Sequence, residues 1–158
     1  MKIGIIVYSQ TGNTHSVALK LNEKLTAAGH SVNMERLMPV GDPKPGDTNV
    51  KFEKLPDLNI YDCLVFGAPV QAFSLCSAMK SYLSQIAPLN NKKVACLTTE
   101  AFPYKWMGGS RAIAQMKKLC ESKSGIVCGT GIVNWSNKQR EKMIVDVVEK
   151  LASQVIKG

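Results

Sequence analysis

The sequence lacks several features that would tie the protein to a membrane or to a secretory route. No apolar run approaches the roughly 20 residues that a helix needs to span a bilayer, and no low-complexity segment or internal repeat is visible. The opening stretch MKIGIIVY is too short for a secretory signal peptide and has no small-residue cleavage site. We therefore expect a cytoplasmic protein without a membrane span.

The five cysteines lack the spacing of a metal site. No two of them form a CxxC pair, and neither histidine lies near a cysteine in the sequence, so a zinc site is unsupported. Cys63, Cys96 and Cys128 fall in apolar runs typical of strands, which predicts buried, reduced thiols. Cys76 has no basic neighbour in the sequence and is interpreted as unreactive.

Acidic residues are scarce, with 12 Asp and Glu against 20 Lys and Arg and a net charge of +8 at pH 7. A positive excess can indicate nucleic-acid binding. The lysines, however, occur as scattered pairs such as Lys92–Lys93 and Lys117–Lys118, and no nucleic-acid motif accompanies them. We therefore expect a solvated basic surface and no nucleic-acid partner.

The 158 residues are 45% hydrophobic and 20% charged, which is typical of a globular protein and predicts a single domain over residues 1–158. Strand-like apolar runs alternate along the chain with segments of helical periodicity. This order predicts an α/β fold, a parallel sheet with helices on both faces. The expected strands are 3–8, 31–38, 63–67, 94–98 and 125–133, and the expected helices lie around 17–25, 76–86, 113–120 and 144–155.

Several local signals refine this arrangement. Gly29 is expected to end the first helix, and the alternating pattern of residues 31–38 indicates an edge strand. The segment 39–59 is rich in Pro, Gly and Asp, which predicts a long connection with at most a short helix. Ser136 or Asn137 is expected to cap the last helix.

The stretch YSQTGNTHS, residues 8–16, joins the first expected strand to the first expected helix. In parallel sheets ligands bind at the carboxyl ends of the strands, where the strand order reverses. Hydroxyls and amides gather around Gly12 with no lysine or arginine among them, and a helix N-terminus adds free backbone amides that suit a phosphate. The pattern leaves open that Thr and Asn only cap the helix. A GxxxxGK[ST] loop and a GxGxxG fingerprint are both absent.

The motif SQTGNT after an N-terminal strand resembles the phosphate-binding loop of the flavodoxins, whose usual form is [ST]-x-T-G-x-T. YDCLVFGAPV resembles the third strand of that family and the loop after it, and TTEAFPYKWMGGSRAI stands where the loop after the fourth strand would be. The resemblance spans essentially the whole chain. It implies a three-layer α/β sandwich with a five-stranded parallel sheet in the order 2-1-3-4-5, without the insertion of long-chain flavodoxins, and FMN as the cofactor.

The resemblance also implies the residues of the FMN site. The phosphate would lie against Ser9, Gln10, Thr11, Gly12, Asn13 and Thr14. The flavin ring would be bordered by Pro69, Val70, Gln71, Ala72 and Phe73 from one loop, and by Thr98, Thr99, Glu100, Ala101, Phe102, Trp106, Gly108 and Gly109 from the next.

Within this site, backbone groups of the first ring-bordering loop are expected near the flavin N5, and Thr98 and Thr99 near the polar pyrimidine edge. Gly108 and Gly109 would allow a close approach. Four aromatics, Phe73, Phe102, Tyr104 and Trp106, are candidates to flank the ring, and ordinary packing is the alternative for each. Glu100 would either lie beside the flavin N1 or turn to solvent.

Three functions remain open at this point. The resemblance implies an FMN electron carrier that shuttles electrons between redox partner proteins, with no catalytic residue and no metal. GAPVQAFSLCSAMKSYL is also somewhat similar to a loop of flavodoxin-like quinone reductases, so an FMN-dependent NAD(P)H:quinone-type oxidoreductase is the alternative. A binding module that has lost its flavin is the third. Flavodoxins are typically acidic, whereas this chain is basic, which favours acidic redox partners.

Overall fold

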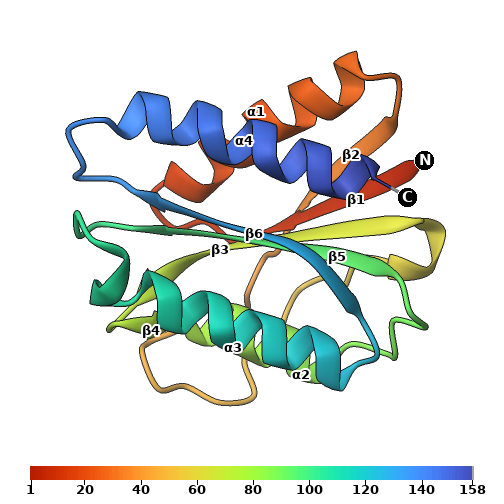
Figure 1. The fold of residues 1–158 in the computed structure, drawn as a ribbon. Coiled ribbons are helices and arrows are strands. Elements are labelled where there is room, and N and C mark those ends of the chain that lie inside the picture. The colour runs from red at the N-terminus through yellow and green to blue at the C-terminus, as the bar shows by residue number, and fades with distance from the viewer. Residues whose placement is uncertain (158) are drawn as a thin grey trace.

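The computed structural model describes residues 1–157 and has a central sheet between two layers of helices (Figure 1). The strands are β1 (Lys2–Val7), β2 (Ser31–Arg36), β3 (Cys63–Gln71), β4 (Ser74–Leu75), β5 (Lys93–Glu100) and β6 (Ile126–Asn134). The helices are α1 (Asn13–Ala27), α2 (Ser77–Gln85), α3 (Gly109–Ser122) and α4 (Arg140–Ile156), with short 3-10 helices η1 (Leu58–Ile60) and η2 (Lys105–Met107). α1 and α4 cover one face of the sheet, and α2 and α3 cover the other.

The five long strands are parallel and lie in the order β2-β1-β3-β5-β6. This order is the predicted 2-1-3-4-5 arrangement, which is confirmed, and β2 lies at an edge as expected. β4 was not expected. It pairs antiparallel with the end of β3 because the chain reverses tightly at Ala72 and Phe73. The strand order reverses between β1 and β3, so the carboxyl ends of these two strands mark the expected ligand edge.

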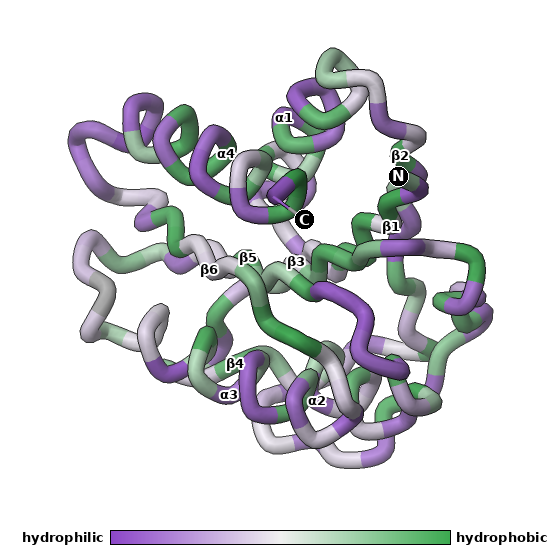
Figure 2. The backbone as a smooth tube through the Cα atoms, turned by 45° about the vertical axis from the view of Figure 1, so that its right-hand side comes forward, coloured by the Kyte–Doolittle hydropathy of each residue, from purple (hydrophilic) through white to green (hydrophobic). Residues whose placement is uncertain are grey.

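Apolar side chains alternate between the two faces of the sheet, as the pleat of a strand requires. Ile3, Ile5 and Val7 of β1 pack with α1 and α4, whereas Ile6 belongs to the core on the side of α2 and α3. β3 follows the same alternation. Figure 2 shows hydrophobic residues, in green, concentrated in the central strands between the two layers of helices. The two cores fix the sheet and thereby the loops at its carboxyl edge.

The helix ends test the local predictions. Gly29 has φ 93° directly after α1, and His30 and Gly29 donate to the carbonyls of Leu25 and Thr26, so its predicted role as the C-terminal glycine is confirmed. The predicted cap of α4 is wrong, because α4 follows Gln139 and has no side-chain cap. The Ser136 hydroxyl and the Asn137 amide instead donate to carbonyls of the loop after β5.

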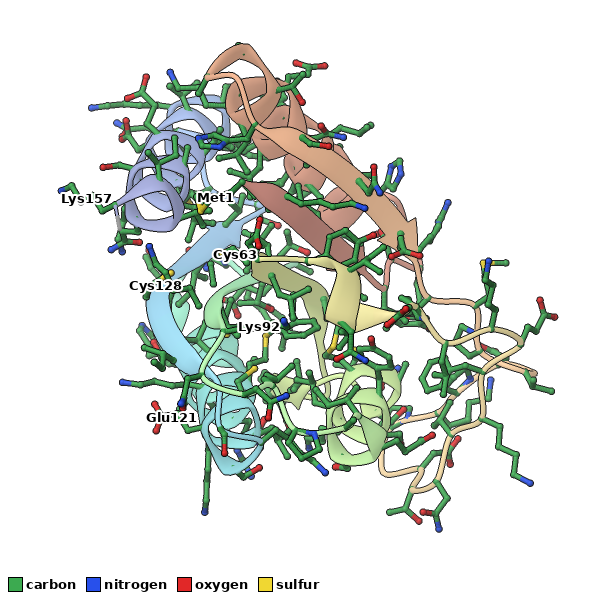
Figure 3. The ribbon with its side chains drawn as sticks, turned by 90° about the vertical axis from the view of Figure 1, so that its right-hand side faces the viewer. Met1, Cys63, Lys92, Glu121, Cys128 and Lys157 are labelled. Atoms are coloured by element: carbon green, nitrogen blue, oxygen red, sulfur yellow. The ribbon has the colours of Figure 1, made fainter. Side chains whose placement is uncertain are left out.

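All five cysteines are free; Cys63 and Cys96 are buried as expected, and Cys76 and Cys120 are buried as well. Cys128 is only half-buried, because a register shift opposite Val94 and Ala95 leaves it as an extra residue in the edge strand β6. Cys63 and Cys128 lie at the amino end of the sheet, with the two chain termini (Figure 3). A hydrogen bond from the Cys63 thiol, with a smaller contribution from Lys93, lowers the pKa of Cys128 to about 7.

No helix among residues 1–157 is long and apolar enough to cross a bilayer.

Candidate functional site

The candidate site lies at the carboxyl edge of the sheet, at the end opposite to the chain termini (Figure 1). Four connections meet along this edge: the loop from β1 to α1, the turn from β3 to β4, the loop from β5 to α3, and the loop from β6 to α4. All three segments predicted from the sequence to border a ligand belong to the first three of these connections. The fourth was not predicted to take part.

The loop before α1 presents a set of free backbone donors. Gly12 has φ 90°, a conformation that favours glycine, and the Ser9 hydroxyl accepts from the amides of Gly12 at 3.1 Å and His15 at 3.4 Å. Within residues 1–157, the backbone amides of Gln10, Thr11, Asn13 and Thr14 have no hydrogen-bond acceptor. Such a cluster at the start of a helix, where the dipole is positive, is a ready anion site.

Two side chains connect this loop to the sheet. The Thr14 hydroxyl is buried and lies 2.8 Å from the Thr99 hydroxyl at the end of β5, with either one as the donor. Arg36, at the end of β2, donates from Nη2 to the Ser9 carbonyl at 3.1 Å. The sequence motif contains no cation, but the fold places this guanidinium directly behind the loop. The only signal for it was its position at the end of the strand adjacent to β1.

The turn between β3 and β4 is strained. Ala72 and Phe73 have φ of 49° and 61°, the left-handed region that residues with a Cβ rarely adopt. Side-chain bonds hold the turn in place, because Gln71 Oε1 accepts from the Ser77 amide at 3.2 Å and Gln115 Oε1 accepts from the Leu75 amide at 2.8 Å. Backbone strain of this kind is concentrated at functional sites.

Glu100 is buried at the end of β5, with 3% of its surface exposed. Its carboxylate accepts from Asn134 Nδ2 at 2.5 Å and from the Gly109 amide at 3.1 Å. Burial raises the pKa of Glu100, and the hydrogen bonds from Asn134 and Gly109 oppose the rise. The carboxylate therefore anchors the start of α3. It does not turn to solvent, which was one of the two positions that the sequence left open.

The two glycines before α3 are packed against protein. A Cβ on Gly108, which has φ 128°, would lie 2.8 Å from Val70 Cγ1 and 3.0 Å from the Phe73 Cα. A Cβ on Gly109 would lie 2.7 Å from Glu100 Oε1. The glycines thus bring the loop after β5 against the turn after β3, and their predicted contact with a ligand stays a prediction.

The remaining residues predicted for the site differ in their exposure to solvent. Pro69 and Val70 are half-buried at the end of β3, Gln10, Thr11 and Ala101 are exposed, and Asn13 is half-buried. Thr98 is fully buried, and its hydroxyl donates to the Ala68 carbonyl at 2.7 Å. The Thr98 side chain therefore already has a partner within the sheet.

Four exposed aromatic side chains gather on the two ring-bordering loops. The Phe73 and Phe102 rings stack with centroids 5.2 Å apart and planes 6° apart, across the gap between the two loops. Tyr104 and Trp106 stack in the same manner at 6.1 Å. An aromatic pair that joins two loops at the same edge of the sheet as a cluster of free amides suits a planar ligand carrying a phosphate.

The loop from β6 to α4 completes the edge. Asn134 Nδ2 donates to the Phe102 carbonyl at 3.2 Å in addition to Glu100, and Asn137 Nδ2 lies 3.5 Å from the Pro103 carbonyl. Asn134 is 1% exposed and was not recognised from the sequence, because its position in an apolar strand gives no sign of its partners. Among residues 1–157, no group of three metal-ligating side chains is present.

Comparison with known proteins identifies the fold. No protein-family model and no curated protein matches the sequence. Among solved structures, a short-chain flavodoxin associated with a non-canonical PDU bacterial microcompartment has a TM-score of 0.71 at 14% identity, over 99% of this chain and 97% of that one. A cysteine-to-serine variant of the flavodoxin from Pseudomonas aeruginosa gives 0.70 at 15% identity, with both chains covered completely.

Two further similar structures are of proteins described by a cofactor or an activity. A flavoprotein from Lactobacillus acidophilus in complex with FMN has a TM-score of 0.66 at 16% identity, over 92% of this chain and 97% of that one. A protein described as flavone reductase gives 0.72 at 11% identity, and this chain spans 64% of it. The chain therefore has the flavodoxin fold, and the predicted resemblance is confirmed at that level.

Proposed function

We propose that this protein binds FMN and carries electrons between redox partner proteins. The observation that carries the proposal is the set of four unpaired backbone amides at the start of α1, on the same edge as the stacked Phe73 and Phe102. The first supplies donors for a phosphate dianion, and the second supplies apolar faces for a flavin ring. FMN combines both groups in one molecule.

The phosphate would be held by the predicted residues 9–14. The free amides donate to its oxygens, and the hydroxyl of Thr11 and the amide of Asn13 add donors from side chains. The Arg36 guanidinium, held by the Ser9 carbonyl, adds a positive charge behind the loop. Each hydrogen bond to a charged group is worth about 1.5–3 kcal/mol, so several together give a strong anchor.

The flavin, when bound, supplies the redox chemistry by accepting and releasing electrons. The chain's own residues position and shield it: Phe73 and Phe102 would separate to flank the ring, and the backbone of Gln71 and Ala72 would face its edge. The Glu100 carboxylate accepts hydrogen bonds from Asn134 and Gly109, so its negative charge lies next to the start of α3. This environment contains no evident general acid or base, which favours a carrier over an enzyme.

A titration of the apoprotein with FMN tests the proposal. Flavin fluorescence should be quenched with a stoichiometry of one, and the bound flavin should be reduced by dithionite and reoxidised by a protein acceptor. The absence of quenching would contradict FMN binding. The fold match to a flavone reductase motivates the second candidate, an NAD(P)H-dependent oxidoreductase. Sustained oxidation of NADPH with a quinone by the FMN-loaded protein would establish that function instead.

A further inference from the structure

We propose that the loop after β5 and the loop before α4 form one docking surface for an acidic electron-transfer protein. This basic aromatic surface consists of residues 101–111 and 135–142. The inference rests on the proposed function, because it assigns the partner that would exchange electrons with the flavin. The charge of the proposed partner is the opposite of the charge that an acidic carrier would require. Four features of the chain support the proposal.

The two segments are joined by hydrogen bonds into one surface. Asn134 reaches the Phe102 carbonyl, Ser136 donates to the Ala101 carbonyl, and Asn137 lies within bonding distance of the Pro103 carbonyl. Three consecutive carbonyls of one loop are thus held by side chains of the other. These hydrogen bonds fix the conformation of the surface before a partner binds. This favours docking without a large loss of conformational entropy.

Positive charge is concentrated on these segments. Residues 101–111 contain two basic residues and no acidic one, and residues 135–142 contain three basic residues and one acidic one. These 19 residues carry a net charge of +4, half of the net charge of the chain in less than an eighth of its length. A patch of one sign steers the encounter with a partner of the opposite sign.

The exposed cations have few intramolecular partners. Arg111 and Lys138 are exposed, and within the described part of the chain neither forms an ion pair. Arg140 is different, since it packs 4.8 Å from the Trp135 ring and lies 3.5 Å from Glu141. Lys142 is likewise exposed and forms no ion pair within the described residues. Arg111, Lys138 and Lys142 are therefore charges that remain available to an acidic partner.

Apolar anchors lie within the same surface. Trp106 is 78% exposed and Tyr104 is 57% exposed, and the two stack on each other. The flavin ring would take Phe73 and Phe102, which leaves this second pair available to a partner. Tyr, Trp and Arg are the residues that contribute most at protein interfaces. A partner that covers the pair would also lie at the edge where the flavin is expected.

Electron transfer to two acceptors of opposite charge tests the proposal. The FMN-loaded protein is reduced anaerobically and mixed with an acidic c-type cytochrome or with basic mitochondrial cytochrome c, and cytochrome reduction is followed by stopped flow. We expect faster reduction of the acidic cytochrome, with a rate constant that falls at least about tenfold between low salt and about 0.5 M salt. The basic cytochrome should not show this fall.

Charge variants locate the surface. The double variant Arg111→Glu/Lys138→Glu is compared with Lys20→Glu/Lys118→Glu, which changes the net charge equally at exposed positions on α1 and α3. The first pair should slow reduction of the acidic cytochrome at low salt at least about tenfold, and the control pair by much less. Trp106→Ala should slow it at low and at high salt.

Three results would overturn the proposal: equal effects of the two double variants, a preference for the basic cytochrome, and tight binding of duplex DNA at this surface without a preference for the acidic cytochrome. FMN affinity is measured for every variant. Failure of the wild-type protein to bind FMN would refute the proposed function itself and is distinguished in this way from failure of the docking proposal.

Discussion

Removal of the Asn134 side chain should destabilise the protein by an amount that depends on pH. Asn134 Nδ2 donates to the buried Glu100 carboxylate and to the Phe102 carbonyl. A bond to a charged group is worth about 1.5–3 kcal/mol and a neutral one about 0.5–1.5 kcal/mol, so Asn134→Ala should cost about 2–4 kcal/mol at pH 7. The loss is measured by urea denaturation, as the difference in free energy of unfolding from wild type.

The sign of the pH dependence follows from the pKa of Glu100. Burial already raises it above the ordinary value of 4.5, so the ionisation of Glu100 lowers the stability of the folded state as pH rises through that region. Loss of the Asn134 donor raises the folded pKa further. The cost of Asn134→Ala should therefore be smallest below pH 4.5, where Glu100 is neutral, and should grow by about 1–2 kcal/mol as pH rises past the folded pKa.

Asn137→Ala is the matched control, because Asn137 lies three residues after Asn134 and its side chain bonds only neutral backbone groups: Nδ2 lies 3.5 Å from the Pro103 carbonyl, and Oδ1 accepts from the Gln139 amide at 2.8 Å. Its cost should not vary with pH. A cost of Asn134→Ala that is constant with pH, or that grows as pH falls, would refute the account of Glu100.

Three further predictions concern the rest of the chain. Thr14→Val should weaken FMN binding by about 1–3 kcal/mol, since it removes a buried hydroxyl beside the phosphate loop, and unchanged affinity in a fluorescence titration would contradict that assignment. Ala72→Gly should stabilise the protein by up to about 1 kcal/mol in urea denaturation, because the left-handed conformation costs a residue with a Cβ about 1–2 kcal/mol, and a loss of stability would argue against strain in the turn. Cys128 should react with Ellman's reagent at a rate that rises as pH passes about 7, and Cys63→Ala should move this rise to higher pH. A rate that is independent of pH, or that survives Cys128→Ser, would contradict the assignment.

The fold was predictable from the sequence because its signals are local. Continuous apolar runs predicted the central strands and an alternating pattern predicted the edge strand β2, while the spacing of Val17, Leu21 and Leu25 predicted the inner face of α1. β4 escaped the prediction because a two-residue strand has no periodicity, and its turn uses Ala and Phe where glycine or asparagine would have signalled a reversal. The cap of α4 was misplaced because Ser136 and Asn137 have the right chemistry for a cap but bond across the edge of the sheet.

The site was predictable only in part, because its supporting contacts join residues far apart in the chain. The hydroxyl-rich loop was visible as a motif, whereas Arg36 behind it and Asn134 beside Glu100 depend on which strands are neighbours. Gly108 and Gly109 were expected to serve a ligand, yet their present neighbours are Phe73 and Glu100. A sequence indicates that a glycine is needed but not which group approaches it.

The central claim, that the free amides before α1 bind a phosphate attached to a flavin, is tested most directly by comparing FMN with riboflavin. The two ligands share the ring and differ in the phosphate. Because several charged hydrogen bonds of about 1.5–3 kcal/mol each would be lost, the account predicts that FMN quenches with a Kd at least about 100-fold lower than riboflavin. Equal affinity for the two ligands, or no binding of FMN, would contradict it.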